Sequence, residues 1–258
     1  MPERQHTLRA TIDWSYRLLD AQERTLLKEL APFVGGVRID SAESIWDDAI
    51  ELLSSLAEKS LLRRREDRDR EPRFWLLETI RRFALDQATT DKSISDAADL
   101  HAEHFVALAA RAAPHLTAAD QGPWLDRLED DLPNLRAALD HLTSRRPELA
   151  LRMAADMFWL WDIRGYLSEG RQRLLEVLAA TRGDPGDRAR AAFGAGRISA
   201  IVGEPAAAVP LLTEAAALGQ AAGDNRLPVN ALSNLAWSYQ LIGDHVRCVS
   251  VSEEARGD

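Results

Sequence analysis

Three glycines in the C-terminal half of the chain recur at a nearly constant spacing. Gly165, Gly203 and Gly243 are separated by 38 and 40 residues. Each follows a stretch rich in alanine and large apolar residues, and each precedes a second stretch with helical periodicity. Glycine accepts the positive φ with which a chain leaves a helix. A recurring unit of helix, glycine turn and helix restricts this part of the chain to stacked helical hairpins.

The period is close to that of tetratricopeptide repeats, although slightly longer. One such hairpin cannot bury its own apolar face, so the core must come from stacking of neighbours. We therefore predict a tetratricopeptide-like α-solenoid over residues 91–258, with the polar residues 87–96 at its boundary. The last repeat stops at residues 253–258 without a solvating helix. We expect either that the chain is a fragment of a longer protein or that another copy covers this end, as in a homodimer.

The first 90 residues have a different order of elements. A capping-box pattern, Asp20-x-x-Glu23, opens a helix that we expect to end at Gly35-Gly36. A short extended piece, further helices and a hairpin with a polar tip over residues 63–72 follow. This is the order of a winged helix. The predicted fold class is mainly α, with a winged helix over residues 1–90 that precedes the α-solenoid.

Winged helices often bind DNA through the helix that comes before the wing. Here that helix spans about residues 48–60 and carries three acidic residues against Lys59 alone. Residues 1–90 contain 15 basic and 17 acidic side chains, which disfavours contact with phosphates. The hairpin can be a solvated element of mixed charge, or it can touch DNA or a neighbouring domain. The candidates for such contacts are Lys59, Arg63, Arg64, Arg65, Arg68 and Arg70.

Composition limits the possible classes of protein. The chain of 258 residues has a formal net charge of −9, which disfavours nonspecific binding of nucleic acid. The single cysteine, Cys248, excludes an internal disulfide and fits a reducing compartment. No segment has the ~20 consecutive apolar residues of a membrane span. We expect a cytoplasmic protein that does not associate with membranes.

Several stretches together resemble one family of large bacterial regulators: His6–Asp20, Glu23–Gly36, Leu52–Leu62, Arg73–Ala84 and Glu129–Asp140. These are the signal-transduction ATPases with numerous domains, the STAND class, with an AAA-like, NB-ARC-type ATPase. They occur among bacterial transcriptional regulators of the LuxR type and the antibiotic-regulatory type. The resemblance implies a nucleotide-binding domain upstream, then a winged helix, then tetratricopeptide-like repeats. It places the first helices of the repeats on a concave binding face.

The chain lacks the phosphate-binding loop G-x-x-x-x-G-K-[ST]. We therefore expect no enzyme activity and no cofactor here, with ATP or ADP bound only by an upstream domain. Related ATPases read the nucleotide through a Met-His-Asp triplet, where this chain has Leu76-Leu77-Glu78. His101 and His104 are three residues apart on a helix, but no third ligand is evident, so we expect no metal site.

Aromatic residues and arginines gather on or beside the first helices of the repeats. These residue types are common anchors of binding interfaces. The candidates for binding a protein or a small effector are Trp159, Trp161, Tyr166, Arg171, Arg197, Trp237 and Tyr239. The alternative is that the tryptophans belong to the core, since helix positions 159 and 161 point about 200° apart.

The sequence is compatible with two functions. In the first, the chain is the regulatory and sensing portion of a STAND-type transcriptional regulator. Its winged helix relays the state of the ATPase domain, and its repeats bind a protein or small effector. In the second, it is a self-standing DNA-binding winged helix with a helical arm for dimerisation or interaction.

Overall fold

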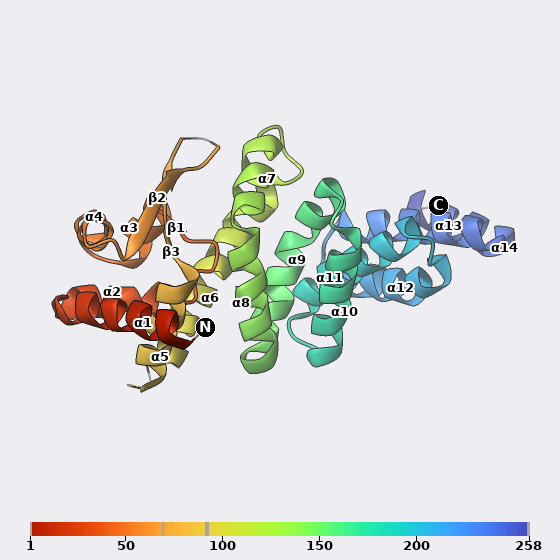
Figure 1. Cartoon of the computed structure of the whole chain (residues 1–258). Helices are drawn as coiled ribbons and strands as arrows, with labels where there is room; N and C mark the ends of the chain where they lie inside the picture. The colour runs from red at the N-terminus through yellow and green to blue at the C-terminus, as the bar shows by residue number, and fades with distance from the viewer. Residues whose placement is uncertain (1, 69, 91–92, 257–258) are drawn as a thin grey trace. The chain divides into compact units, whose positions relative to one another are not determined.

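The computed structural model describes residues 2–68, 70–90 and 93–256, with side chains from residue 9 onward. It divides into two units, the first made of residues 1–107 and 130–141 and the second of residues 108–129 and 142–258. The first unit begins with six helices and three short strands (Figure 1). They are α1 (Pro2–Arg17), α2 (Ala21–Glu29), β1 (Val37–Arg38), α3 (Ile39–Ile45), α4 (Ala49–Glu58), β2 (Leu62–Glu66), β3 (Pro72–Leu76), α5 (Glu78–Thr90) and α6 (Ile94–Ala112).

The remaining elements are all helical. They are η1 (Ala113–His115), α7 (Gln121–Asp130), α8 (Leu132–Arg145), α9 (Pro147–Arg164), α10 (Leu167–Ala180), α11 (Pro185–Ile201), α12 (Pro205–Ala221), α13 (Leu227–Ile242) and α14 (His245–Arg256). None of the helices in the described part of the chain combines the length and apolar character needed to cross a bilayer.

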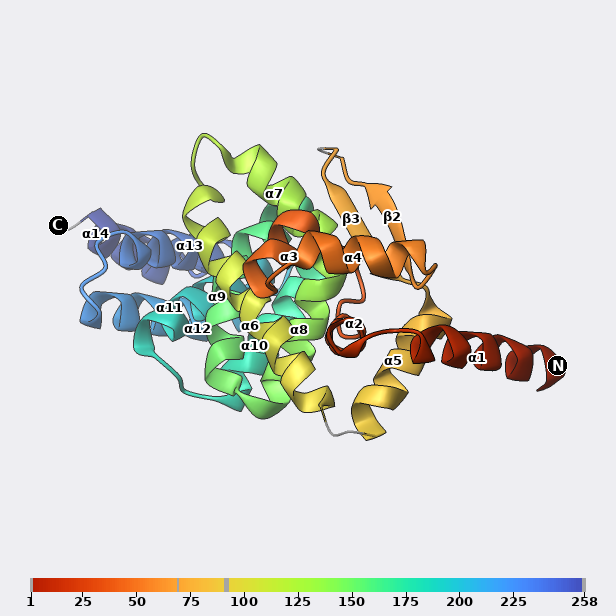
Figure 2. The same ribbon diagram turned by 90° about the vertical axis from the view of Figure 1, so that its left-hand side faces the viewer.

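The three strands form one antiparallel sheet in the order β1-β3-β2. Val37 pairs with Phe74, and Leu62 pairs with Leu76 on the other side of β3. Helices α3 and α4 lie beside this sheet (Figure 2). Leu53 and Leu56 of α4 are fully buried, as are Leu26 and Leu27 of α2. This arrangement of helices around a β-hairpin confirms the predicted winged helix.

The winged helix forms the predicted capping box, but one helix and the hairpin tip are shorter than predicted. The capping box of α2 is present, because the Asp20 side chain accepts from the Glu23 backbone and Glu23 caps the Asp20 N–H in return. The prediction that this helix runs to Gly35-Gly36 is wrong, since α2 ends at Glu29 and a turn follows. The polar hairpin tip is shorter than predicted, because β2 continues through Glu66. Pairing with β3 satisfies the backbone of this arginine-rich strand while its side chains remain in solvent.

The second unit contains the predicted helical hairpins, α9 with α10, α11 with α12 and α13 with α14 (Figure 1). The three turn glycines all have a positive φ, between 79° and 87°. Close packing within the stack depends on small residues. A Cβ added to Gly194 would lie 2.7 Å from the Phe158 ring, and one added to Gly196 would lie 2.7 Å from Leu212. The tetratricopeptide-like hairpin fold is therefore confirmed for the repeats.

Helix α14 differs from the other helices of the repeats because none of its described residues is buried. Val246 is 83% exposed and Val249 is 58% exposed. Leu241 and Ile242, at the end of α13, also face solvent. Several apolar side chains of α13 and α14 are thus exposed at this end of the repeats.

Candidate ligand pocket and wing surface

Arg73, at the start of β3, is fully buried. Its Nε donates to Oδ2 of Asp67 at 2.7 Å, and its Nη1 donates to Oδ1 of Asp131 at 2.8 Å. Nη1 also reaches the Gly35 carbonyl at 3.2 Å. Burial alone would lower the pKa of Arg73, but the two aspartates raise it overall, so the guanidinium stays charged. Arg73 thus differs from Arg63, Arg64 and Arg65 of the paired strand β2, which are exposed.

Asn134 of α8 completes this buried network. Its Nδ2 donates to the Gly36 carbonyl at 2.9 Å, and its Oδ1 accepts from the Gly35 N–H at 2.9 Å. Gly36 has a φ of +74°, and a Cβ on it would lie 2.5 Å from the Phe74 carbonyl oxygen. Gly36 is therefore needed for the close approach of two chain segments rather than for ending a helix. Three of the stretches that carry the family resemblance meet at this network.

Lys59, a predicted contact residue, is engaged within the winged helix. Its ammonium binds Oε1 of Glu23, which also accepts from the Ser55 hydroxyl at 2.6 Å. Burial raises the pKa of Glu23, but the bonds from Lys59 and Ser55 outweigh this and lower that pKa overall. One carboxylate thus links the start of α2 to the end of α4.

We expect Glu23→Gln to destabilise the winged helix by roughly 1–3 kcal/mol near neutral pH, because a buried charged hydrogen-bond acceptor is lost. The folded-state pKa of Glu23 is lowered from 4.5, so its contribution is present above that pH and disappears as the pH falls below it. Urea unfolding of both proteins at neutral pH and near pH 3 would measure this. An equal difference between the two proteins at both pH values would contradict the assignment.

The wing carries the other predicted contact residues, and all five are exposed: Arg63, Arg64, Arg65, Arg68 and Arg70. Two of them have neighbours that restrain them. The Arg65 guanidinium lies 5.3 Å from the centre of the Trp75 ring, and Arg68 pairs with Asp130 at 3.4 Å. The hairpin therefore gathers a set of cations, interrupted by the exposed Glu66 and Glu71.

The surface around α4 has the opposite character. A cavity of about 390 Å³ at the start of the helix is lined by Glu43, Asp47, Asp48 and Glu51 among others. Ile50 beside them is half exposed. Acidic and apolar side chains at the position of a DNA-reading helix are unfavourable next to phosphates.

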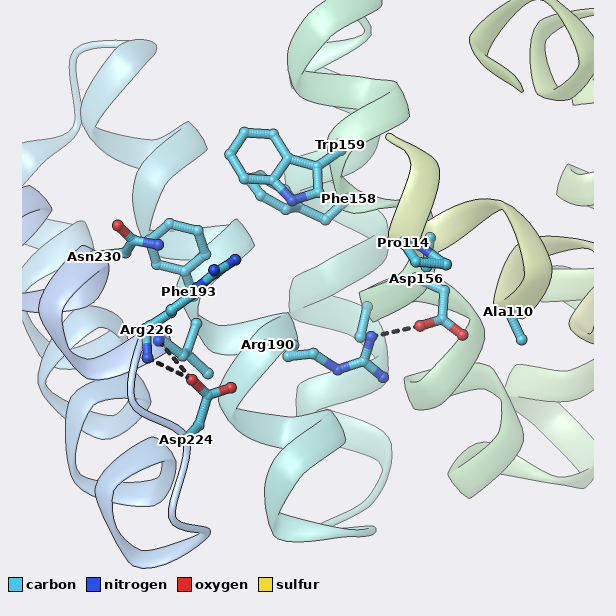
Figure 3. Close-up of a pocket in the computed structure, with 13 residues that line it drawn as sticks. Ala110, Pro114, Asp156, Phe158, Trp159, Arg190, Phe193, Asp224, Arg226 and Asn230 are labelled. Carbon is cyan, nitrogen blue, oxygen red and sulfur yellow. Dashed lines mark hydrogen bonds and ion pairs between the residues drawn. The ribbon is translucent and has the colours of Figure 1, made fainter. Parts of the chain in front are cut away.

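The second unit contains a cavity of about 460 Å³ (Figure 3). It is formed by the first helices of the three hairpins together with the end of α6 and η1. Its lining residues are Ala110, Ala113, Pro114, Ala155, Asp156, Phe158, Trp159, Arg190, Phe193, Asp224, Arg226, Leu227 and Asn230.

Aromatic rings from two successive first helices form one wall of the cavity. Phe158 and Phe193 meet edge to face with their centroids 5.6 Å apart, and Trp159 lies 4.6 Å from Phe158. The Arg197 guanidinium is 5.7 Å from the Trp159 ring and is held by Asp162 at 3.2 Å. The Trp159 indole is therefore supported from one side, and this wall can take a flat apolar body.

The charged groups of the cavity are mostly committed to one another. Arg190 bonds Asp156 and also donates to Asp187 at 2.7 Å. Burial raises the pKa of Asp156 although Arg190 opposes the shift. Asp224 accepts the backbone N–H groups of Leu227 and Arg226, which lower its pKa and cap the start of α13. The Arg226 side chain extends away from the Asp224 carboxylate toward the aromatic side of the cavity (Figure 3).

The candidates predicted in the repeats do not gather at one place. Trp159 lines the cavity, and Arg197 supports it. Trp161 is fully buried, and a Cβ added to Gly170 would lie 2.5 Å from the Cβ of Trp161. Trp161 therefore belongs to the core. Trp237 is 38% exposed on α13.

The three remaining candidates have contacts within the repeats. Tyr166 donates to Glu129 at 2.8 Å, and Arg171 donates to the Ser199 hydroxyl at 3.0 Å. Tyr239 lies 5.7 Å from the guanidinium of Arg247.

The sequence did not indicate several residues of the cavity, including Asp156, Arg190, Phe193 and Arg226. A signal for two of the pairs was present. Asp156 and Arg190 are 34 residues apart, and so are Trp159 and Phe193. This separation is four residues, about one helical turn, shorter than the 38 residues between Gly165 and Gly203, and residues one turn apart lie on the same face of a helix. Comparison of residues 34 apart would therefore have predicted that the members of each pair lie close together on neighbouring first helices.

His101 is a core residue, 2% exposed. Burial lowers the pKa of His101 to about 3, so its imidazole is neutral. Its ring contacts Phe33 and Phe105. Among the described residues, no three histidine, cysteine or acidic side chains are grouped in a way that could hold a metal ion.

Comparison with protein families identifies one part of the chain. Residues 19–88 match the model of the winged helix-turn-helix domain. This range contains α2 to β3 and most of α5, with the hairpin in the position of the wing. Residues 19–88 form a winged helix-turn-helix domain.

Among known proteins, one described as an HTH-type transcriptional regulator of Mycobacterium bovis is 37% identical over 195 residues. The match covers 70% of this chain and 21% of that protein. Two proteins of Mycobacterium tuberculosis with the same description match to the same extent. The chain thus spans about a fifth of the length of the curated relatives it matches.

Two solved structures show weaker likeness. A Podospora anserina protein of the kinesin light chain type with nearly identical TPR-like repeats has 17% identity and a TM-score of 0.42, over 67% of this chain and 90% of that one. A STAND protein with a tetratricopeptide repeat sensor from Pyrococcus horikoshii has 15% identity and a TM-score of 0.33. That match covers 93% of this chain and 50% of the other. Both TM-scores are below 0.5, and neither likeness bears on function.

Proposed function

We propose that this chain is the regulatory segment of a STAND-type transcriptional regulator. In this proposal the winged helix relays the state of an upstream nucleotide-binding domain, and the helical repeats bind a protein or small effector. An effector that binds one arrangement more tightly than another shifts the population between them. Nucleotide would bind only to the upstream domain, so this segment would carry out no reaction. We also propose that the chain belongs to the LuxR-type or antibiotic-regulatory regulators. The same proposal includes a domain boundary near residue 90 and a cytoplasmic location.

The surface of α4 supports a relay more than direct reading of DNA. Its outer side is acidic and apolar, and Lys59 at its end is bound to Glu23. The wing is also joined to α8 through Arg73, Asp131 and Asn134. A winged helix with these features is suited to contact protein and to pass on a displacement through a stiff connection.

The exposed arginines of the wing support a second candidate function. Five arginines on one hairpin provide the cations that phosphate contacts require. In this alternative the chain binds DNA by itself, and the repeats serve dimerisation or another interaction.

Fluorescence anisotropy of labelled duplex DNA at several salt concentrations would separate the two functions. We expect weak binding at physiological salt, since residues 1–90 have a negative balance of charge. Replacement of Arg63, Arg64 and Arg70 by glutamine should then weaken binding no more than the same replacement of three exposed arginines elsewhere. Suitable controls are Arg111, Arg182 and Arg256. The DNA-binding alternative would be favoured if the chain binds DNA tightly and the wing variant binds it at least tenfold more weakly, while the control variant does not.

A further inference from the structure

The cavity of the repeats has the size of a site for a small molecule. Its volume of about 460 Å³ lies within the roughly 300–1,000 Å³ typical of such sites. Phe158, Trp159 and Phe193 line one side, and the small residues Ala110 and Pro114 lie on the other (Figure 3). Large rings that face small residues leave space for a flat apolar body beside the rings.

The hydrogen-bonding capacity of the cavity indicates the charge of its ligand. Both carboxylates of the lining are already used as acceptors, Asp156 by Arg190 and Asp224 by two backbone N–H groups. Arg190 in turn divides its donors between Asp156 and Asp187. The Arg226 guanidinium, in contrast, makes no hydrogen bond or ion pair with any described residue, although Asp224 attracts it electrostatically. Among the charged groups of the lining, the Arg226 guanidinium is therefore the one whose donors remain available.

The position of Arg226 makes this donor available to a ligand. Its backbone N–H takes part in the cap of α13, which fixes the place of the residue without use of the side chain. The guanidinium points toward the aromatic side of the cavity (Figure 3). An anionic group bound there would form charge-assisted hydrogen bonds, which are about twice as strong as neutral ones.

We propose that this cavity binds a small organic anion with a flat apolar body. The carboxylate or sulfonate group of the ligand binds Arg226, and its rings lie against Trp159 and Phe193. This inference rests on the proposed function in one respect, namely that the repeats bind an effector, and it adds the chemical class of that effector. Asn230, on the first turn of α13, provides a further polar group at the same end of the cavity.

The test uses two fluorescent probes that differ in one group. Anilinonaphthalene sulfonate carries an anionic group on aromatic rings, and phenylnaphthylamine has the same rings without it. We expect saturable binding of the sulfonate to the full chain, and Arg226→Gln should weaken it about tenfold through the loss of a charge-assisted hydrogen bond. The neutral probe should keep its affinity within about twofold. Trp159→Leu should weaken both probes because both use the aromatic wall.

Arg182→Gln is the matched control, since Arg182 is an exposed arginine of the same repeats and does not line the cavity. Equal sulfonate affinity in the Arg226→Gln and Arg182→Gln proteins would overturn the proposal. Loss of the neutral probe to the same degree as the sulfonate would also overturn it, as would absence of saturable binding of the sulfonate. Failure here is distinct from failure of the proposed function, because the DNA experiment uses substitutions in the wing and none in the cavity.

Discussion

Replacement of Arg73 by methionine is expected to lower the free energy of unfolding by about 3–5 kcal/mol, the usual cost of removing one partner from a buried ion pair. The aspartates that it binds, Asp67 and Asp131, have side chains that are only 4% and 3% exposed. Without the guanidinium, Asp131 would lose its ion pair at 2.8 Å, and Asp67 would keep only the longer pairs with Arg38 at 3.6 Å and Arg65 at 3.9 Å. Urea denaturation of the two proteins, followed by circular dichroism, measures the difference.

The matched control is Arg63→Met, the same substitution on the same hairpin at an exposed position. We expect it to change stability by less than about 0.5 kcal/mol, as is usual for surface sites. Addition of Asp131→Asn to Arg73→Met should recover part of the loss, because one uncompensated charge is removed. If Arg73→Met were no more destabilising than Arg63→Met, the buried network would not contribute to folding.

Replacement of Trp161 by alanine is expected to destabilise the chain by about 3–5 kcal/mol, through lost burial and the cavity that remains. Trp161 is fully buried on α9, and Gly170 of α10 packs directly against it. Its role is therefore structural, although the sequence made it a candidate for partner binding. Thermal and urea unfolding measure the loss.

Trp237→Ala provides the comparison for this second result. Trp237 is 38% exposed, so the same substitution removes about three fifths as much buried surface. We expect a loss of roughly 2–3 kcal/mol, in proportion to the buried area concerned. Similar losses for the two tryptophans would contradict the assignment of Trp161 to the core.

Local and periodic features of this chain were predictable from its sequence. The turn glycines at residues 165, 203 and 243 have the positive φ that was expected of them. The capping box of Asp20 and Glu23 is formed as predicted. Such features depend on residues within one or two helical turns of each other, so the sequence contains all the information that they need.

The sequence did not show which of two residues of the same type is buried and which is exposed. Arg73 is part of the same arginine-rich hairpin as Arg63, yet one is buried and the other is exposed. Trp159 lines a cavity, whereas Trp161, two positions along the same helix, is in the core. The difference for Arg73 comes from Asp131 and Asn134, which are about 60 residues away in the chain.

The sequence by itself determined the order of elements, the winged helix followed by helical hairpins, and the turns that join the hairpins. Only the tertiary structure decided which charged and aromatic side chains lie inside and which remain available to a ligand. Burial depends on contacts between segments that are distant in the chain, and one sequence does not specify those contacts through spacing or residue type. The cost of an unpaired buried charge then requires that Arg73 and its aspartates be buried together, while Arg226 keeps its donors available in the cavity of the repeats.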